Sequence, residues 1–296
     1  MIAQLAGILL PVFVLAMVGY FWRRLGVPFE REFVTRLIMN VAGPCLVVDS
    51  LSQLSLPLRD FVGMLAAAAA MFVATVLVAW GILRLAGLSV RSYLPALAVG
   101  NTGNMGLPLC LFAFGQQGLG IAVAIYVTYS VGQFTLTPML QSGVAPLRTL
   151  TTTPILYGAL AGLALLAGHW RLPAPLASSI HLLGQLMIPL MLLALGNTLG
   201  GLRTKHLSFA TVWGCARIAL GFSIALGIGA LFHLHGIARG VFVLQGAMPA
   251  AVFNYLFAAR YDRAPDEVAG IVLMSTLTAT LLLPFIVAYA LKTSGL

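Results

Sequence analysis

Apolar segments, each about as long as a membrane-spanning helix, follow one another along almost the whole chain. A helix needs roughly twenty apolar residues to cross the hydrocarbon core of a bilayer. Hydrophobic residues make up 60% of the chain and charged residues only 8%, with a mean hydropathy of +1.02, so the bilayer must act as the solvent. The sequence therefore predicts an all-α polytopic membrane protein with ten transmembrane helices, near residues 4–22, 33–53, 60–83, 92–114, 118–140, 151–168, 174–200, 206–232, 237–259 and 266–291.

The distribution of charge predicts how these helices are oriented. The chain has 16 Lys and Arg against 7 Asp and Glu, a net charge of +9. Cytoplasmic loops of membrane proteins collect Lys and Arg, and an external N-terminus places most of these residues in such loops. We therefore expect a multi-pass protein of the cell (inner) membrane with both termini outside, in the periplasm. The orientation of the chain in the lipid bilayer thus explains the excess of basic residues. No nucleic-acid partner is expected, because no basic run with interleaved aromatic residues occurs.

Prolines recur at a nearly fixed offset between the two halves of the chain. Three pairs lie 145 or 146 residues apart, namely Pro28 with Pro173, Pro44 with Pro189, and Pro138 with Pro284. Because each half has an odd number of spans, the second half must enter the membrane from the opposite side, which is an architecture of transporters. The prediction is a first five-helix repeat over residues 1–140, a cytoplasmic linker over 141–153, and a second, inverted five-helix repeat over 154–296.

The fourth apolar segment contains residues that interrupt a helix. Residues 100–108 read GNTGNMGLP, with three glycines, two asparagines and a proline at membrane depth. Glycine costs about 1 kcal/mol per helical position relative to alanine and proline removes a backbone hydrogen bond, so we expect the helix to unwind near 101–105. Asn104 is then expected to cap the second half, with Pro108 in its first turn. Unwound backbone in a membrane lines a cavity; the alternative is a kink that only eases packing.

The ninth apolar segment repeats this pattern more weakly. Gln245 and Gly246 precede Pro249, and Asn254 follows. Two broken helices that cross at the membrane midplane direct two helix N-termini, each with roughly half a positive charge, at one point between the repeats. An anion such as a carboxylate fits this field. The alternative for Gln245 and Asn254 is an ordinary hydrogen bond between neighbouring helices.

The two interrupted segments carry a resemblance to a known family. Residues 100–109, GNTGNMGLPL, and 246–261, GAMPAAVFNYLFAARY, resemble the paired crossover motifs of the auxin efflux carrier family of bacterial and plant permeases, including its malonate-transporter-like members. The likeness extends over the whole chain in length, helix count and motif positions. The long cytoplasmic loop of the plant members is missing, so their regulation is not carried over.

This resemblance implies a fold, a motion and a set of site residues. The fold is shared with bile-acid transporters and sodium/proton antiporters, with broken crossover helices at spans 4 and 9. Spans 1, 2, 6 and 7 form a scaffold that makes a homodimer, and spans 3–5 and 8–10 form a transport domain that moves like an elevator with a small organic acid. The asparagine that meets the substrate carboxylate corresponds to Asn101 or Asn104, and the crossover prolines correspond to Pro108 and Pro249.

The candidate substrate-binding residues lie on the two broken helices and on the fifth span. Tyr129 and Gln133 share one face of that span at spacing i, i+4, next to the expected cavity; interhelical hydrogen bonding explains the tyrosine equally well. No cofactor or metal is expected, since the three cysteines lie in apolar stretches without CxxC spacing. The full set is Asn101, Asn104, Gly103, Gly106, Pro108, Gln245, Pro249, Asn254, Tyr129 and Gln133.

Two charged residues stand inside apolar segments. Asp49, late in the second span, is a candidate proton or cation ligand, or it is solvated near the outer interface. Arg217, about ten residues into the eighth span, pairs with another group, holds a substrate anion, or caps the carbonyl end of a broken helix. Coupling or charge pairing is therefore predicted for both residues.

The predicted function is that of a secondary transporter, or permease, for a small organic anion such as a carboxylate. The first alternative is a symporter or antiporter in which Asp49 binds a proton or sodium. An intramembrane enzyme is less well supported, because such enzymes need paired acids, zinc ligands or a Ser/His constellation at membrane depth. A binding or sensor protein is the remaining alternative, although paired broken helices favour movement.

Overall fold

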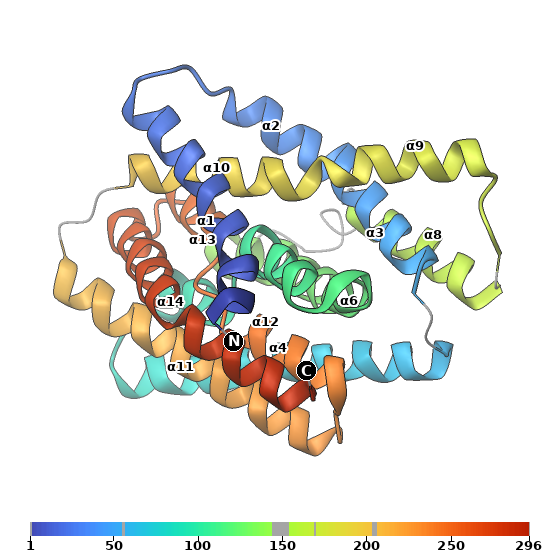
Figure 1. Cartoon of the computed structure of the whole chain (residues 1–296). Coiled ribbons are helices and arrows are strands. Elements are labelled where there is room, and N and C mark those ends of the chain that lie inside the picture. Colours follow the sequence, from blue (N-terminus) through green and yellow to red (C-terminus); the bar gives the residue numbers. More distant parts are fainter. Residues whose placement is uncertain (1, 55–56, 144–153, 169, 203–205, 296) are drawn as a thin grey trace.

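All the regular elements in the described part of the protein are helices. The computed structural model describes residues 2–54, 57–143, 154–168, 170–202 and 206–295 (Figure 1). Seven helices in these ranges are long and apolar enough to cross a membrane, which confirms an all-helical polytopic membrane protein. The elements are α1 Ile2–Arg24, α2 Arg31–Leu37, η1 Ile38–Ala42, α3 Gly43–Ser52, α4 Leu58–Leu85, α5 Val90–Ala98, η2 Thr102–Gly106, α6 Leu107–Ser142, α8 Pro154–Gly168, α9 Ala174–Gln185, α10 Met187–Gly201, α11 Leu207–Leu231, α12 Gly236–Gly246, α13 Val252–Arg260 and α14 Pro265–Ser294.

The difference between ten expected segments and seven long helices has local causes. Residues 92–114 are divided among α5, η2 and the start of α6, and residues 237–259 are divided between α12 and α13. The long helix α6 is itself two helices that meet at Gly115, whose φ of 64° and ψ of −159° are not helical. Only glycine adopts such a conformation readily. The helix α8 has 15 residues and is shorter than a typical span.

The expected linker over residues 141–153 lies mostly outside the described residues. The helix α6 continues to Ser142, and Gly143 follows it in the left-handed conformation with a φ of 74°. This glycine ends the helix, as glycine commonly does at this position. Of the linker, residues 144–153 lie outside the described ranges.

Both halves of the chain contain an interruption ahead of a proline. The π-helical turn η1, in which the Gly43 amide bonds to the Ile38 carbonyl, precedes Pro44. In the second half α9 and α10 meet at Leu186, shortly before Pro189. Proline lacks the amide that would complete the regular helical ladder, so each proline accounts for the irregular turn before it.

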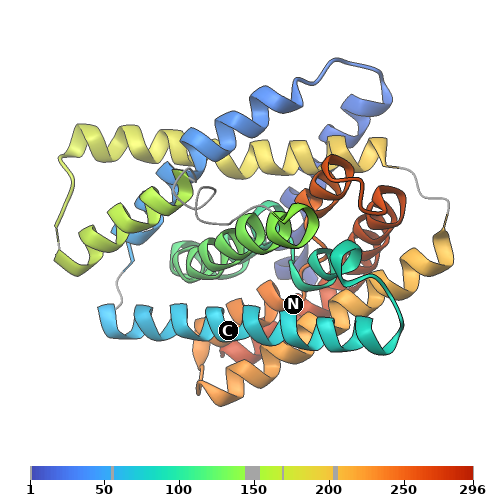
Figure 2. The same cartoon turned by 180° about the vertical axis from the view of Figure 1, so that it is seen from behind.

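The helices form two groups, and α6 belongs to one of them while it contacts α1 and α3 of the other. We call α1 to α3 and α8 to α10 the upper group, and α4 to α6 and α11 to α14 the lower group. In the upper group α1 packs along α10 and α3 packs along α8, and in the lower group α11 packs along α14 and α4 along α6. In Figures 1 and 2, which show opposite sides, α9 and α10 run along the top and α4 and α11 along the bottom.

Glycines allow the helices of the upper group to approach closely. A β-carbon on Gly196 of α10 would lie 1.8 Å from the Ala16 carbonyl oxygen of α1, and one on Gly158 of α8 would lie 2.8 Å from Pro44 in α3. Both distances are below van der Waals contact, so larger residues would force the helices apart. Gly162 of α8 and Gly200 of α10 each lie four residues further along and also face a neighbouring helix, so both glycine pairs serve contacts within this chain.

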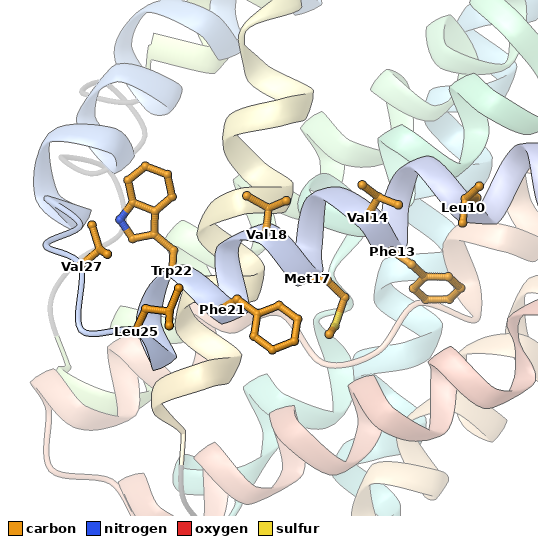
Figure 3. A pocket seen from close by; sticks show the side chains of 9 residues that line it. All are labelled: Leu10, Phe13, Val14, Met17, Val18, Phe21, Trp22, Leu25 and Val27. Atoms are coloured by element: carbon orange, nitrogen blue, oxygen red, sulfur yellow. The ribbon is translucent and has the colours of Figure 1, made fainter.

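The outward face of α1 is uniformly apolar. Figure 3 shows Leu10, Phe13, Val14, Met17 and other side chains of this face around a shallow hollow of about 690 Å³. Leu10 and Phe21 are 61% and 53% exposed. No side chain there supplies a charge to orient a ligand, and such a face suits contact with acyl chains.

Candidate functional site

The two interrupted helices cross each other through short extended segments. The segment at 99–101 runs antiparallel to the segment at 249–251, with a single bridge between Gly100 and Ala250. The Asn101 amide donates to the Pro249 carbonyl at 2.7 Å, and the Ala251 amide donates to the Val99 carbonyl at 3.1 Å. These bonds pair backbone groups that would otherwise be unsatisfied inside a membrane. The crossover, meaning residues 98–106 and 246–254, is thus a defined structure.

The interruption lies two residues earlier than expected, and Asn104 is not the cap. The helix restarts at Thr102 as the π-helical turn η2, so Asn101 holds the cap position, without a side-chain capping bond. The Gly106 amide bonds to the Asn101 carbonyl at 3.1 Å. The expected position was wrong because the bridge to residues 249–251, which are distant in sequence, holds residues 99–101 outside the helix.

Two helix N-termini converge at this crossover. The continuous helix η2 and α6 begins one residue after Asn101, and α13 begins one residue after Ala251. The first amides of a helix have no partner within its own ladder, and the N-terminus carries a partial positive charge. Asn101 and Ala251 both line one small cavity, so the two positive ends border the same space.

A small cavity lies beside these helix ends, at the boundary between the two groups of helices. Its volume is about 30 Å³, enough for one or two water molecules. The upper group contributes Met39 and Met191, the lower group contributes the rest, and no acidic side chain is among them. The lining residues are Met39, Gly100, Asn101, Thr102, Gly103, Asn104, Tyr126, Ser130, Gln133, Phe134, Met191, Ala251 and Phe253.

Four of the expected site residues line this cavity. The Asn101 side chain is 4% exposed, and its Nδ2 has no hydrogen-bond partner among the described residues. Asn104 is only partly buried. A β-carbon on Gly103 would lie 2.8 Å from both Met191 and Tyr126, so any larger residue there would displace these side chains. Gln133 completes the set.

Asn254 and Gln133 tie three parts of the crossover together. The Gln133 Nε2 of α6 donates to the Asn254 Oδ1 of α13 at 3.1 Å, and the Asn254 Nδ2 donates to the Val99 carbonyl at 3.0 Å. Asn254 itself does not line the cavity. Its observed contacts fix the position of α13 relative to the extended segment.

The remaining expected residues lie around the crossover, outside the cavity lining. Pro249 takes part through its carbonyl in the bridge, and Pro108 is buried as the second residue of α6. Gly106 leaves room for the Gln245 side chain, whose Oε1 would lie 2.2 Å from a β-carbon there. Both polar atoms of Gln245 are buried without a hydrogen-bond partner among the described residues.

Of the two residues expected on the fifth span, Gln133 faces the cavity and Tyr129 does not. Tyr129 packs edge-on against Phe72 of α4, with ring centroids 5.2 Å apart, and does not line the cavity. Tyr126 and Ser130 do line it, together with Gln133. Their spacing of i, i+4, i+7 is one helical face, and this periodicity is the signal by which the sequence could have identified them.

Asp49 belongs to a separate polar hollow between α3, α8 and α9. The Asp49 Oδ2 lies 2.9 Å from the Nδ1 of His181, and its Oδ1 accepts from the Gln53 Nε2 at 2.7 Å. The hollow, about 590 Å³, shares no lining residue with the crossover cavity. The pairing with His181 was not expected, since the two residues are 132 positions apart.

Arg217 of α11 is fully buried next to the crossover. A β-carbon on Gly100 would lie 2.3 Å from its Nη2, and none of its guanidinium nitrogens has a hydrogen-bond partner among the described residues. The ion pairs in the described part of the chain do not include it. Arg217 is therefore close to the site without lining the cavity.

Comparison with known proteins shows the family of the chain. A family model for membrane transport proteins matches residues 139–287, which is half of the chain. The chain belongs to this family, the auxin efflux carriers. The resemblance seen in the two motifs is thereby confirmed, and this auxin efflux carrier family member is a multi-pass membrane transporter.

Two relatives extend the similarity over nearly the whole carrier. An uncharacterized transporter of Methanothermobacter thermautotrophicus is 29% identical over 293 residues, covering 93% of this chain and 95% of the relative. An uncharacterized transporter of Methanocaldococcus jannaschii is 22% identical over 296 residues, covering 91% and 93%. The similarity therefore includes both arms of the crossover.

Proposed function

We propose that the protein is a secondary transporter that carries a small organic anion, such as a carboxylate, across the cell membrane. The observation that carries this proposal is the pair of helix N-termini at the crossover, next to the unpartnered Asn101 amide and a cavity without acidic side chains. Amide donors and positive helix ends favour an anion. Asn101, Asn104, Gln133 and Tyr126 are the side chains that we expect to contact it.

The position of the cavity supports an alternating-access mechanism. Its volume of about 30 Å³ is too small for an organic acid, so binding requires the lining to separate. Met39 and Met191 belong to the upper group and the other lining residues to the lower group, hence the two groups are the units that move. The upper group corresponds to spans 1, 2, 6 and 7, the proposed scaffold, and the lower group slides against it like an elevator.

The arrangement within each half supports a ten-span inverted repeat. Each half has an interrupted helix shortly before one of the offset prolines Pro44 and Pro189, at 38–42 and at 186, and a second interruption at the crossover. On this proposal the repeats are residues 1–140 and 154–296 with a cytoplasmic linker between them, and both termini lie in the periplasm. The apolar face of α1 offers surface for lipid or for a second copy in a homodimer.

Coupling through Asp49 is the alternative within transport. Both carboxylate oxygens of Asp49 are engaged, by His181 and Gln53, in a hollow separate from the crossover. A proton held by this pair would act on the upper group and would not touch the substrate. Uptake measured with and without proton and sodium gradients, in the wild type and in Asp49→Asn, separates the two mechanisms. No observation on the described residues favours an enzyme or a sensor.

Uptake into proteoliposomes tests the proposed function. Purified protein is reconstituted and offered a panel of dicarboxylates, aromatic acids and amino acids. We expect saturable uptake of at least one anion, and a reduction of at least about ten-fold in Asn104→Ala, since a hydrogen bond to a charged group contributes about 1.5–3 kcal/mol. Gln116→Ala, an exposed amide outside the cavity, is the matched control. Equal uptake in Asn104→Ala and the wild type would contradict the site.

A further inference from the structure

Arg217 is a buried charge that the proposed anion site does not include. It lies in the middle of α11 with no exposed surface, and none of its three guanidinium nitrogens has a hydrogen-bond partner among the described residues. A guanidinium stays charged in proteins. A permanent charge inside a membrane protein needs a source of negative potential nearby, and here that source is not a carboxylate within ion-pair distance in the described chain.

Two glycines leave the space that the guanidinium fills. A β-carbon on Gly100, in the extended segment, would lie 2.3 Å from the Nη2 of Arg217. A β-carbon on Gly221, one turn further along α11, would lie 2.6 Å from its Nη1. Both distances are shorter than any real β-carbon contact, so any other residue at these positions would displace the guanidinium. The side chain is therefore enclosed between α11 and the crossover.

The same two positions lie beside carbonyl oxygens at the end of α12. The hypothetical β-carbon on Gly221 would lie 2.1 Å from the Gly246 carbonyl oxygen, and the one on Gly100 would lie 3.4 Å from the Met248 carbonyl oxygen. Gly246 is the last residue of α12, and Ala98, the last residue of α5, lies two residues before Gly100. Helix C-termini carry a partial negative charge and unpaired carbonyls. Arg217 thus lies next to the negative ends, whereas the cavity lies next to the positive ends.

We propose that the Arg217 guanidinium is a built-in cation that occupies a carbonyl-lined cation site at the helix C-termini of the crossover. Unwound carbonyls and helix C-termini are the groups with which membrane transporters coordinate free cations. Here the charge is covalently attached, so it compensates the partial negative charge of the helix ends without a free ion. Arg217 is a positioning residue. Its charge compensates the negative helix C-termini of the crossover, and the positive helix N-termini at the cavity remain free for an anion.

Removal of the side chain leaves a site that a free cation of the same shape fills. We expect Arg217→Ala to unfold at a lower temperature than the wild type, and millimolar guanidinium chloride to raise its unfolding temperature by about 3 °C or more through binding to the folded state. Urea, a neutral molecule of the same planar shape, and choline chloride, a bulky cation, should have no such effect. The wild type should respond to none of them. Stabilisation by urea equal to that by guanidinium, or none by either, would overturn the proposal.

A second pair of variants separates charge from volume if Arg217→Ala does not fold. Arg217→Lys keeps the charge and Arg217→Met keeps a similar length without it. We expect the lysine variant to retain the wild-type unfolding temperature within about 3 °C and the methionine variant to lose more than that; a methionine variant as stable as the wild type would contradict a need for charge. These measurements require no substrate. If the proposed function fails, the wild type shows no uptake; if this inference fails, the unfolding temperatures differ from those expected. The two failures are thus distinct. Only the role of Arg217 in transport rests on the proposed function.

Discussion

The Asn101 side chain is buried and yet has an unpaired donor, a combination that does not stabilise a fold. Its side chain is 4% exposed and its Nδ2 is buried without a hydrogen-bond partner among the described residues. An unpaired buried donor costs about 1–3 kcal/mol of folding free energy. We therefore predict that Asn101→Ala unfolds at the same temperature as the wild type or higher, while its uptake rate falls at least about ten-fold. Thermal unfolding in detergent and initial uptake rates in proteoliposomes measure the two effects.

The combination of the two readouts makes this prediction specific. Gln116→Ala, at an exposed amide near the kink in α6, should change neither quantity. If Asn101→Ala lowered the unfolding temperature together with uptake, the side chain would be a structural element of the crossover. Such a result would remove Asn101 from the binding site and leave Asn104 and Gln133 as its amides.

Four of the ten residues predicted from the sequence lie at the cavity, and their role in binding stays a prediction. Asn101, Gly103 and Asn104 come from the helix-breaking motif, and Gln133 comes from the face of the fifth span. The cap was assigned to Asn104, because a local rule places the cap at the asparagine nearest the restart. The structure gives that position to Asn101, since the bridge with residues 249–251 decides where the helix begins. A contact between segments about 150 residues apart has no local signature.

At the scale of elements, the crossover is held by more than its single bridge. The Asn254 side chain bonds to the Val99 carbonyl in one arm and accepts from Gln133 of α6. We predict that Asn254→Ala lowers the free energy of unfolding by about 1–3 kcal/mol, because it leaves the buried Gln133 amide without a partner. In a double-mutant cycle with Gln133→Ala, the coupling energy should be about 0.6–1.7 kcal/mol.

This cycle has a clear contrary outcome. If the effects of Asn254→Ala and Gln133→Ala on the free energy of unfolding were additive, the two side chains would not act as a pair. Thr135→Ala on the same helix is a useful reference, since Thr135 bonds only to carbonyls of its own helix. Its coupling to Asn254→Ala should be near zero.

At the scale of the whole molecule, apolar length indicated the number of segments and could not indicate which of them are continuous. The segments at 92–114 and 237–259 contain the helix breaks, while Gly115 joins two expected spans into one run of helix. The sequence also gave no sign that Asp49 meets His181 across two helices of the upper group. Both facts depend on how helices pack, which hydropathy does not record.

The division into two groups predicts which contacts must break during transport. Met191 of α10 and Tyr126 of α6 meet at the cavity, since both side chains lie 2.8 Å from the position of a β-carbon on Gly103. We expect that Met191→Cys with Tyr126→Cys, in a background where Cys45, Cys110 and Cys215 are replaced by serine, forms a cross-link with mercuric ion. This link joins the upper and lower groups, and it should abolish the uptake that the double variant shows before cross-linking, until a thiol reductant restores it.

A matched pair within one group shows whether the loss comes from blocked motion. Phe222 of α11 and Tyr289 of α14 have ring centroids 5.8 Å apart and both belong to the lower group. A cross-link between cysteines at these positions should leave uptake unchanged, because a cross-link within a unit that moves as a rigid body does not restrict its motion. If the link between Met191→Cys and Tyr126→Cys also left uptake unchanged, the boundary between the two groups would not be a sliding interface. The moving unit would then have to be sought within the lower group, with the helix breaks of the crossover as its hinges.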